Sequence, residues 1–155
     1  MLIAFPCALR HLALTDRAAF AAELGLVVPD AWPNPNFAEV LPRIQARYDT
    51  DEFVFLIVED GQVVGEIGAK DPPDARGMIE IGYGVIPAAR RRGITSCAVA
   101  ELADHVKMRG VRVLRADCNV DNVGSIRVLE RSGFTRIGEG EDEDGPLILW
   151  ERRLG

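Results

Sequence analysis

The stretch from Met78 to Arg109 constrains the fold most, because an apolar run, an arginine–glycine loop and a helical pattern follow one another directly. Residues Met78–Ile86 predict a strand that is apolar on both faces except for Glu80. Three consecutive arginines and Gly93 follow, and a helix is expected over Thr95–Arg109. Such a loop directs free backbone N–H groups and the positive end of a helix dipole at one point. The stretch therefore predicts a site for a phosphorylated cofactor.

Hydrophobic periodicity and turn residues predict the other elements. Strands are expected at Leu2–Phe5, Phe53–Val58, Val63–Lys70, Val111–Cys118, Thr135–Glu139 and Leu147–Arg152, and helices at Asp16–Leu24, Phe37–Tyr48 and Val123–Ser132. The two strands that flank the helix after the arginine loop must run parallel, because a crossover joins them. We expect one domain over residues 1–155, an α/β fold with a mixed, mostly antiparallel sheet flanked by helices, in the order β-α-α-β-β-β-α-β-α-β-β.

The composition narrows the classes of function. A net charge of −6 argues against nucleic acid as the main partner, because nucleic-acid binding relies on clustered basic residues. The three cysteines form no CxxC pair and lie near no histidine at metal spacing, so we expect neither a metal site nor a disulfide framework. That pattern favours the cytoplasm, and no apolar run approaches the length of a membrane span.

A second motif follows the next strand. Residues Asn119–Phe134 have the form N-x-x-N-x-x-S-x-x-V-L-E-x-x-G-F, and upstream stand E-I-G-Y, V-x-P and R-x-x-G-x-T between Glu80 and Thr95. In this combination the chain resembles the GNAT superfamily of acyl-CoA-dependent N-acetyltransferases over about a third of its length. The second motif is most similar to the branch that contains the ribosomal-protein N-terminal acetyltransferases.

The resemblance implies acetyl-CoA as co-substrate and a set of residues that would hold it. The N–H groups of the loop would bind its pyrophosphate, with Arg90 and Arg92 pairing with phosphates. The strand end would offer backbone groups to the pantetheine arm, and an N–H there could polarise the thioester carbonyl. The expected cofactor residues are Val85, Ile86, Arg90, Arg91, Arg92, Gly93, Ile94, Thr95, Ser96, Asn122 and Ser125.

Two departures from the family pattern concern the loop and the catalytic acid. Arg91 and Thr95 stand where relatives commonly have smaller residues. Leu129 stands where many relatives have a tyrosine that protonates the leaving thiolate, and Ser125 is the nearest hydroxyl that could take this role. For the general base we expect Glu80, with a pKa raised by partial burial in the central strand, and we keep Glu66 as the reserve.

Several of these residues could instead have purely structural roles. The arginine run could be a solvated turn, Glu80 could be an ion-pair partner, and Asn119 and Asn122 could cap the following helix. The expected activity is transfer of an acetyl group to an amine by direct attack, without a covalent enzyme intermediate. A non-catalytic acyl-CoA-binding or sensor module and a plain interaction domain are the alternatives. No sequence pattern identifies the acceptor, which would be a small-molecule or peptide amine. The sequence also leaves open whether the protein forms a homodimer.

Overall fold

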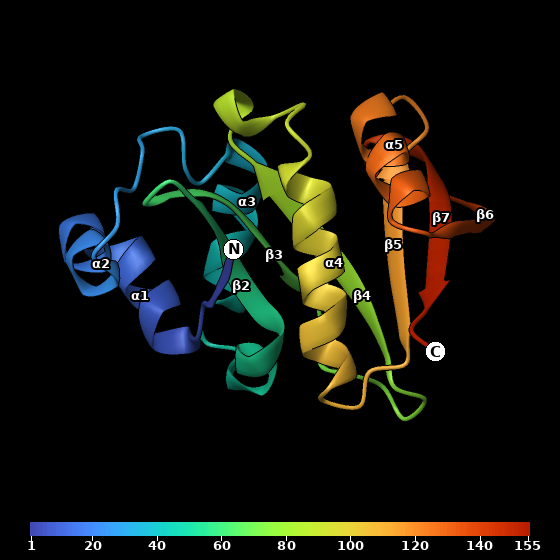
Figure 1. Cartoon of the computed structure of the whole chain (residues 1–155), viewed down its shortest axis with the longest axis horizontal. Coiled ribbons are helices and arrows are strands. Elements are labelled where there is room, and N and C mark those ends of the chain that lie inside the picture. The colour runs from blue at the N-terminus through green and yellow to red at the C-terminus, as the bar shows by residue number, and fades with distance from the viewer.

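The computed structural model describes residues 1–155 and contains a single seven-stranded sheet with five α-helices around it (Figure 1). The strands are β1 (Leu2–Ala4), β2 (Val54–Glu59), β3 (Gln62–Ala69), β4 (Met78–Val85), β5 (Val113–Asn119), β6 (Thr135–Asp142) and β7 (Gly145–Arg153). The helices are α1 (Cys7–Thr15), α2 (Arg17–Leu24), α3 (Pro35–Ile44), α4 (Ile94–Lys107) and α5 (Val123–Arg131). Short 3-10 turns occupy Tyr48–Phe53 and Pro87–Ala89. None of the helices is both long and apolar enough to cross a membrane.

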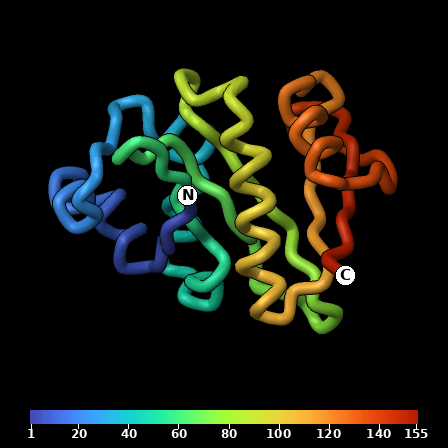
Figure 2. The backbone as a smooth tube through the Cα atoms, viewed as in Figure 1, coloured from blue at the N-terminus to red at the C-terminus, as the bar shows by residue number.

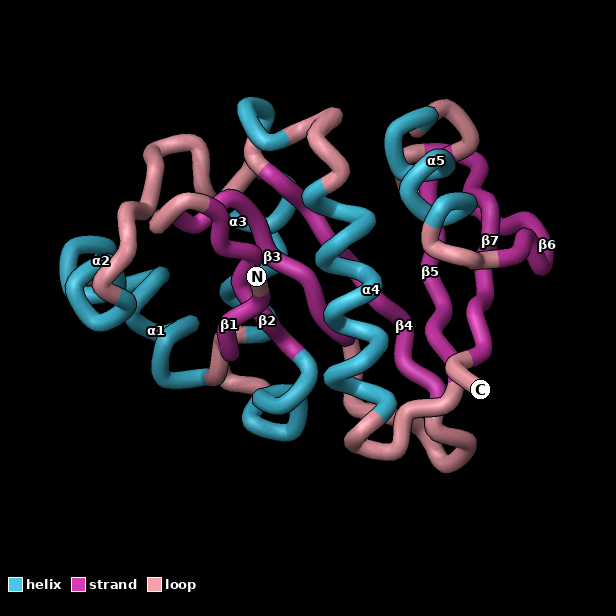
Figure 3. Tube along the Cα trace, in the orientation of Figure 1, coloured by secondary structure: helices cyan, strands magenta, loops and turns pink.

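The sheet has the order β1-β2-β3-β4-β5-β7-β6, so β4 is the central strand, as predicted. All neighbours are antiparallel except β4 and β5, which are parallel and joined through α4. In the view of Figure 3, α4 and α5 lie in front of the sheet and α3 lies behind it. The predicted fold class, a mostly antiparallel mixed sheet between helices, is confirmed.

The element order needs one correction, because α1 was not predicted. This helix follows Pro6 without a side-chain cap, and it carries the fully buried Arg10 on its inner side. The Arg10 guanidinium donates to the Phe5 carbonyl (2.7 Å) and forms an ion pair with Asp51 (2.9 Å). A buried arginine interrupts the apolar periodicity, and without a polar cap the sequence gives no start signal.

The segment between α2 and α3 is anchored in the core by an aromatic cluster. Trp32 is buried and stacks on Phe20 at 5.5 Å, and its ring also meets Phe5 and Phe37. Asn34 caps α3 by accepting from the Phe37 amide (3.0 Å), so this helix begins earlier than expected and ends at Ile44. The cluster holds the chain of residues 32–34 against the sheet beside β3.

Strands β4 and β5 pair only along their first residues. The register joins Met78 to Val113, Ile79 to Leu114 and Glu80 to Arg115, and no pairing follows. Beyond this point β4 continues beside β3 while β5 continues beside β7, so the two strands diverge, as Figure 2 shows. The centre of the sheet is therefore split toward the carboxyl end of β4, where the arginine loop begins.

Candidate functional site

The split exposes backbone hydrogen-bonding groups of β4. The backbone carbonyl of Glu80 accepts from the Lys70 amide, and the Ile86 amide donates to the Val64 carbonyl (2.8 Å). The backbone groups of the even-numbered residues of β4 therefore point toward β3. Because hydrogen-bonding direction alternates along a strand, the N–H and C=O groups of Tyr83 and Val85 point into the split. Of the two residues expected to contact a pantetheine arm, Val85 has a free N–H there, whereas the N–H of Ile86 is already used within the sheet.

The arginine loop lies above the split and ends in a helix start without a side-chain cap. Arg91 has φ 62° and Gly93 has φ 74°, and α4 begins immediately afterwards. Both values lie in the left-handed region, which explains why a smaller residue is common at the position of Arg91. No side chain accepts from the first amides of α4, and none of the three loop arginines forms an ion pair. These donors and charges are free to meet an anion.

Helix α5 lies on the other side of the split, and its Ser125 contacts Tyr83 of β4. Asn122 accepts from the Ser125 amide (3.0 Å), so the capping interpretation of Asn122 is confirmed. The Ser125 hydroxyl forms a hydrogen bond of 2.5 Å with the hydroxyl of Tyr83. Burial raises the pKa of Tyr83 to about 12, so its phenol stays protonated at neutral pH. This contact of Tyr83 was not predicted from the sequence, although the residue is part of the E-I-G-Y motif.

Glu66 on β3 is the buried carboxyl group of the site. Its side chain is only 4% exposed and accepts a hydrogen bond from the Trp32 indole (3.2 Å). Burial raises its pKa to about 8. A Cβ at Gly84 would lie 2.7 Å from both Glu66 Oε2 and Asn34 Nδ2. The glycine therefore lets this carboxyl group lie directly against β4, one residue before Val85.

Glu80 has a different environment, and the expected rise of its pKa is wrong. Partial burial favours its protonated form, but Lys70, at 2.9 Å, together with a hydrogen bond to Asp117 and the charge of Arg115, outweighs burial and lowers the pKa. Lys70 also lies 3.8 Å from Asp117, whose pKa is raised by burial and by the neighbouring Glu80. The ion-pair interpretation of Glu80 is therefore the one that the geometry supports.

The residues predicted to hold the cofactor thus gather at one end of the central strands, whereas Glu80, the predicted base, lies in the paired part of β4 opposite Arg115. The free amides of β4 and the arginine loop line the split and its rim, while Ser125 and Tyr83 bridge it and Glu66 lies beside it. A hollow of about 100 Å³ beside the start of α4 is lined in part by Arg92 and Gly93. No group of three or more His, Cys, Asp or Glu side chains could hold a metal ion.

Comparisons with known proteins agree with this arrangement. The model of the acetyltransferase (GNAT) domain matches residues 8–135. The chain is 32% identical over 120 residues to the uncharacterized N-acetyltransferase YjdG of Bacillus subtilis (strain 168), a match that covers 72% of this chain and 71% of YjdG.

Two solved structures share the fold. One is yncA of Salmonella typhimurium, assigned as an acetyltransferase and solved with its cofactor acetyl-CoA (TM-score 0.69, 21% identity, covering 100% of this chain and 94% of yncA). The other is the ribosomal-protein-alanine N-acetyltransferase of Brucella melitensis (TM-score 0.64, 22% identity, covering 99% of each chain). With the domain model spanning most of its length, the chain belongs to the GNAT acetyltransferase family.

Proposed function

We propose that the protein is an N-acetyltransferase that transfers an acetyl group from acetyl-CoA to an amine by direct attack. The observation that carries this proposal is the split between β4 and β5, with free strand amides on one side and an uncapped helix start at its rim. An extended, amide-containing arm with a diphosphate at one end is the ligand that such a site fits. Membership of the GNAT family and the acetyl-CoA bound by yncA support the same ligand.

The residues that would hold acetyl-CoA follow from this fit. The amides of residues 91–96 and the guanidinium groups of Arg90 and Arg92 would bind the diphosphate. The Val85 N–H would donate to the thioester carbonyl and stabilise the negative charge that develops there. Acetyl-CoA itself supplies the activated acyl group. Arg91 adopts the left-handed geometry that the loop requires, at a backbone cost of about 1–2 kcal/mol relative to glycine.

Glu66 is the general base in this proposal. A carboxyl group with a pKa of about 8 is better matched to an ammonium proton than one with an ordinary pKa, and it lies against Gly84, next to the thioester-binding amide of Val85. Glu80 is held by Lys70 and has a lowered pKa, which makes it the weaker candidate. Glu66 therefore accepts the proton of the acceptor amine, directly or through one water.

Ser125 is the proposed acid, and Tyr83 supports it. The Ser125 hydroxyl would donate a proton to the leaving thiolate, and the hydrogen-bonded phenol of Tyr83 would return a proton to Ser125. Leu129 stands where many relatives have a tyrosine that protonates the thiolate, but Tyr83 supplies a phenol to the split from β4 instead. It therefore supports an enzyme over a non-catalytic acyl-CoA sensor, which the absence of that tyrosine would otherwise favour.

The experiment that tests the proposal is an amine panel with a free-thiol readout. Polyamines, amino acids, aminoglycosides and N-terminal peptides would be incubated with acetyl-CoA, and released CoA would be measured. N-terminal peptides deserve first place in the panel because the second motif is most similar to the ribosomal-protein branch. Binding of acetyl-CoA without CoA release from any amine would favour a sensor, and absence of acetyl-CoA binding in calorimetry would refute the proposal.

The catalytic assignment needs matched variants. Glu66→Gln should slow CoA release far more than Glu80→Gln, while neither should weaken acetyl-CoA binding, because both carboxyl groups lie outside the residues that would hold the cofactor. Ser125→Ala should lower kcat with little change in acetyl-CoA affinity. A Glu80→Gln variant that loses activity while Glu66→Gln keeps it would return the role of base to Glu80.

A further inference from the structure

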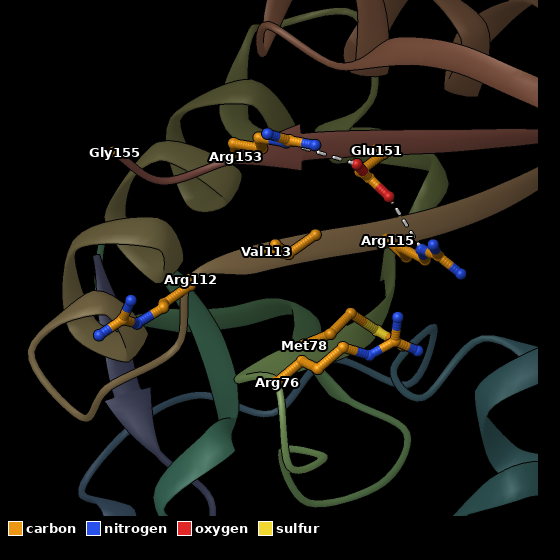
Figure 4. A pocket seen from close by; sticks show the side chains of 8 residues that line it. All are labelled: Arg76, Met78, Arg112, Val113, Arg115, Glu151, Arg153 and Gly155. Carbon is orange, nitrogen blue, oxygen red and sulfur yellow. Dashed lines mark hydrogen bonds and ion pairs between the residues drawn. The ribbon is translucent and has the colours of Figure 1, made fainter.

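A hollow of about 470 Å³ lies at the opposite end of β4 and β5 from the arginine loop (Figure 4). Its lining consists of Arg76, Met78, Arg112, Val113, Arg115, Glu151, Arg153 and Gly155. We call it the arginine hollow. Along β4, Met78 and Val85 are separated by seven steps of about 3.3 Å, so the hollow lies on the order of 20 Å from the proposed acyl-transfer site.

The sheet register builds this hollow from three neighbouring strands. Met78 and Val113 are paired across the parallel part of β4 and β5, and their partly buried side chains form its apolar portion. Val113 in turn lies opposite Arg153 on β7, and Arg115 lies opposite Glu151. The positions of these side chains are therefore set by regular strand pairing.

Positive charge dominates the lining. Four arginines and a single carboxylate, Glu151, line the hollow, so the lining side chains have a formal charge of +3 in a chain whose net charge is −6. Arg115 lies 3.0 Å from Glu151 and Arg153 lies 3.9 Å from it. Figure 4 shows both contacts along one side of the hollow.

Arg76 and Arg112 have no acidic side chain within ion-pair distance. Neither side chain takes part in an ion pair or donates a hydrogen bond, and both are exposed. One oxygen of the nearby Asp74 carboxylate, Oδ1, accepts from the backbone amides of Arg76 and Met78, at 2.8 and 3.0 Å. These hydrogen bonds and the charges of Arg76 and Arg115 lower the pKa of Asp74. Two guanidinium groups thus stay free at the edge of a concave, partly apolar surface.

We propose that the arginine hollow binds a small phosphorylated molecule. Guanidinium groups bind phosphate oxygens through paired hydrogen bonds, and the excess of positive charge matches a phosphate or diphosphate better than a single carboxylate. The carbon skeleton of the ligand would lie on Met78 and Val113. The volume is in the range of small-molecule sites. This site is separate from the loop that would hold the diphosphate of acetyl-CoA, and its existence does not depend on the proposed acetyl transfer.

Calorimetric titration with pyrophosphate and with adenosine monophosphate tests the proposal. Each titration is run with saturating coenzyme A, which occupies the diphosphate site proposed at the loop, so that only binding elsewhere is measured. The test variant is Arg76→Gln/Arg112→Gln, in which two unpaired, exposed arginines are removed. The control is Arg91→Gln/Arg92→Gln, which removes the same charge from the loop at the other end of β4. Thermal unfolding of both variants shows whether they stay folded. If the test variant does not, Arg112→Lys replaces it, because lysine keeps the charge but cannot form the paired hydrogen bonds of a guanidinium group.

Saturable binding to the wild type should weaken by about tenfold or more in the test variant and stay within about twofold in the control. Acetyl-CoA affinity should fall in the loop control and stay unchanged in the test variant. A failure of the proposed function is therefore distinguishable from a failure of this site. Absence of saturable binding would overturn the proposal, as would a loss seen only in the loop variant or an equal loss in both. Citrate binding as tight as pyrophosphate binding would overturn the preference for phosphate.

Discussion

Replacing Glu66 with glutamine should change how the stability of the protein depends on pH. Burial raises the pKa of Glu66 from its ordinary value of 4.5 to about 8 in the folded protein. Between these two values the unfolded chain has an ionised Glu66 while the folded chain keeps it protonated. Folding then takes up a proton, and the free energy of unfolding falls as the pH rises.

The magnitude follows from the width of this interval. It spans roughly 3.5 pH units, and each unit corresponds to about 1.4 kcal/mol, so the loss approaches about 5 kcal/mol above pH 8. The stabilising effect of the protonated carboxyl group is fully present below pH 4.5 and is lost as the pH rises through about 8. Glutamine stays neutral throughout and keeps an oxygen that can accept from the Trp32 indole.

Urea unfolding at intervals between pH 4 and pH 9 would measure this effect. The free energy of unfolding of Glu66→Gln, relative to that of the wild type, should increase by up to about 1.4 kcal/mol per pH unit above pH 5. A pH-independent effect of the amide on stability would shift all values equally and leave this slope unchanged. Glu80→Gln is the matched control: because the pKa of Glu80 is lowered, its contribution is present at neutral pH and is lost on acidification. A Glu66→Gln difference that does not vary between pH 5 and pH 8 would refute the buried, protonated state of Glu66.

Three further substitutions test the backbone and cap geometry of the site by thermal or urea unfolding. Gly93→Ala should cost about 1–2 kcal/mol, because the residue has φ 74° and an added Cβ would meet no atom within 4 Å, so the backbone conformation alone sets the cost. Gly84→Ala should cost about 1–3 kcal/mol and lower activity, since its Cβ would lie 2.7 Å from Glu66 and Asn34; an unaffected variant would contradict the tight packing there. Asn122→Ala should cost about 1 kcal/mol by removing the cap of α5, whereas Asn122→Asp, which keeps the accepting oxygen, should cost less; equal losses would show that the cap contributes nothing.

The sequence predicted best those features that depend on local patterns. The helix expected over Asp16–Leu24 is α2, which has Asp16 as its N-cap and Gly25 in the left-handed conformation just past its end. The parallel pairing of β4 with β5 followed from the crossover between Met78 and Cys118. These features are set by residues a few positions apart or by the handedness of the chain.

The features that were missed depend on contacts between distant segments. Glu66 is buried because Trp32, more than thirty residues earlier, packs over β3 and donates to its carboxylate. Glu80 lost its expected raised pKa because the register of β3 with β4 places Lys70 beside it. Tyr83 meets Ser125 across the split, and neither periodicity nor spacing indicates that contact. The order of preference between the two carboxylates therefore had to come from the structure.

The rate of CoA release as a function of pH, compared between wild type and Glu66→Gln at saturating acetyl-CoA, shows whether Glu66 is the general base. With an accepted amine, the wild-type rate should rise toward pH 8 as Glu66 ionises and then level off. Glu66→Gln should lose this rise and about 100-fold or more of the rate, with acetyl-CoA affinity unchanged in calorimetry. A Glu66→Gln variant that keeps the wild-type rate and pH profile would contradict the account.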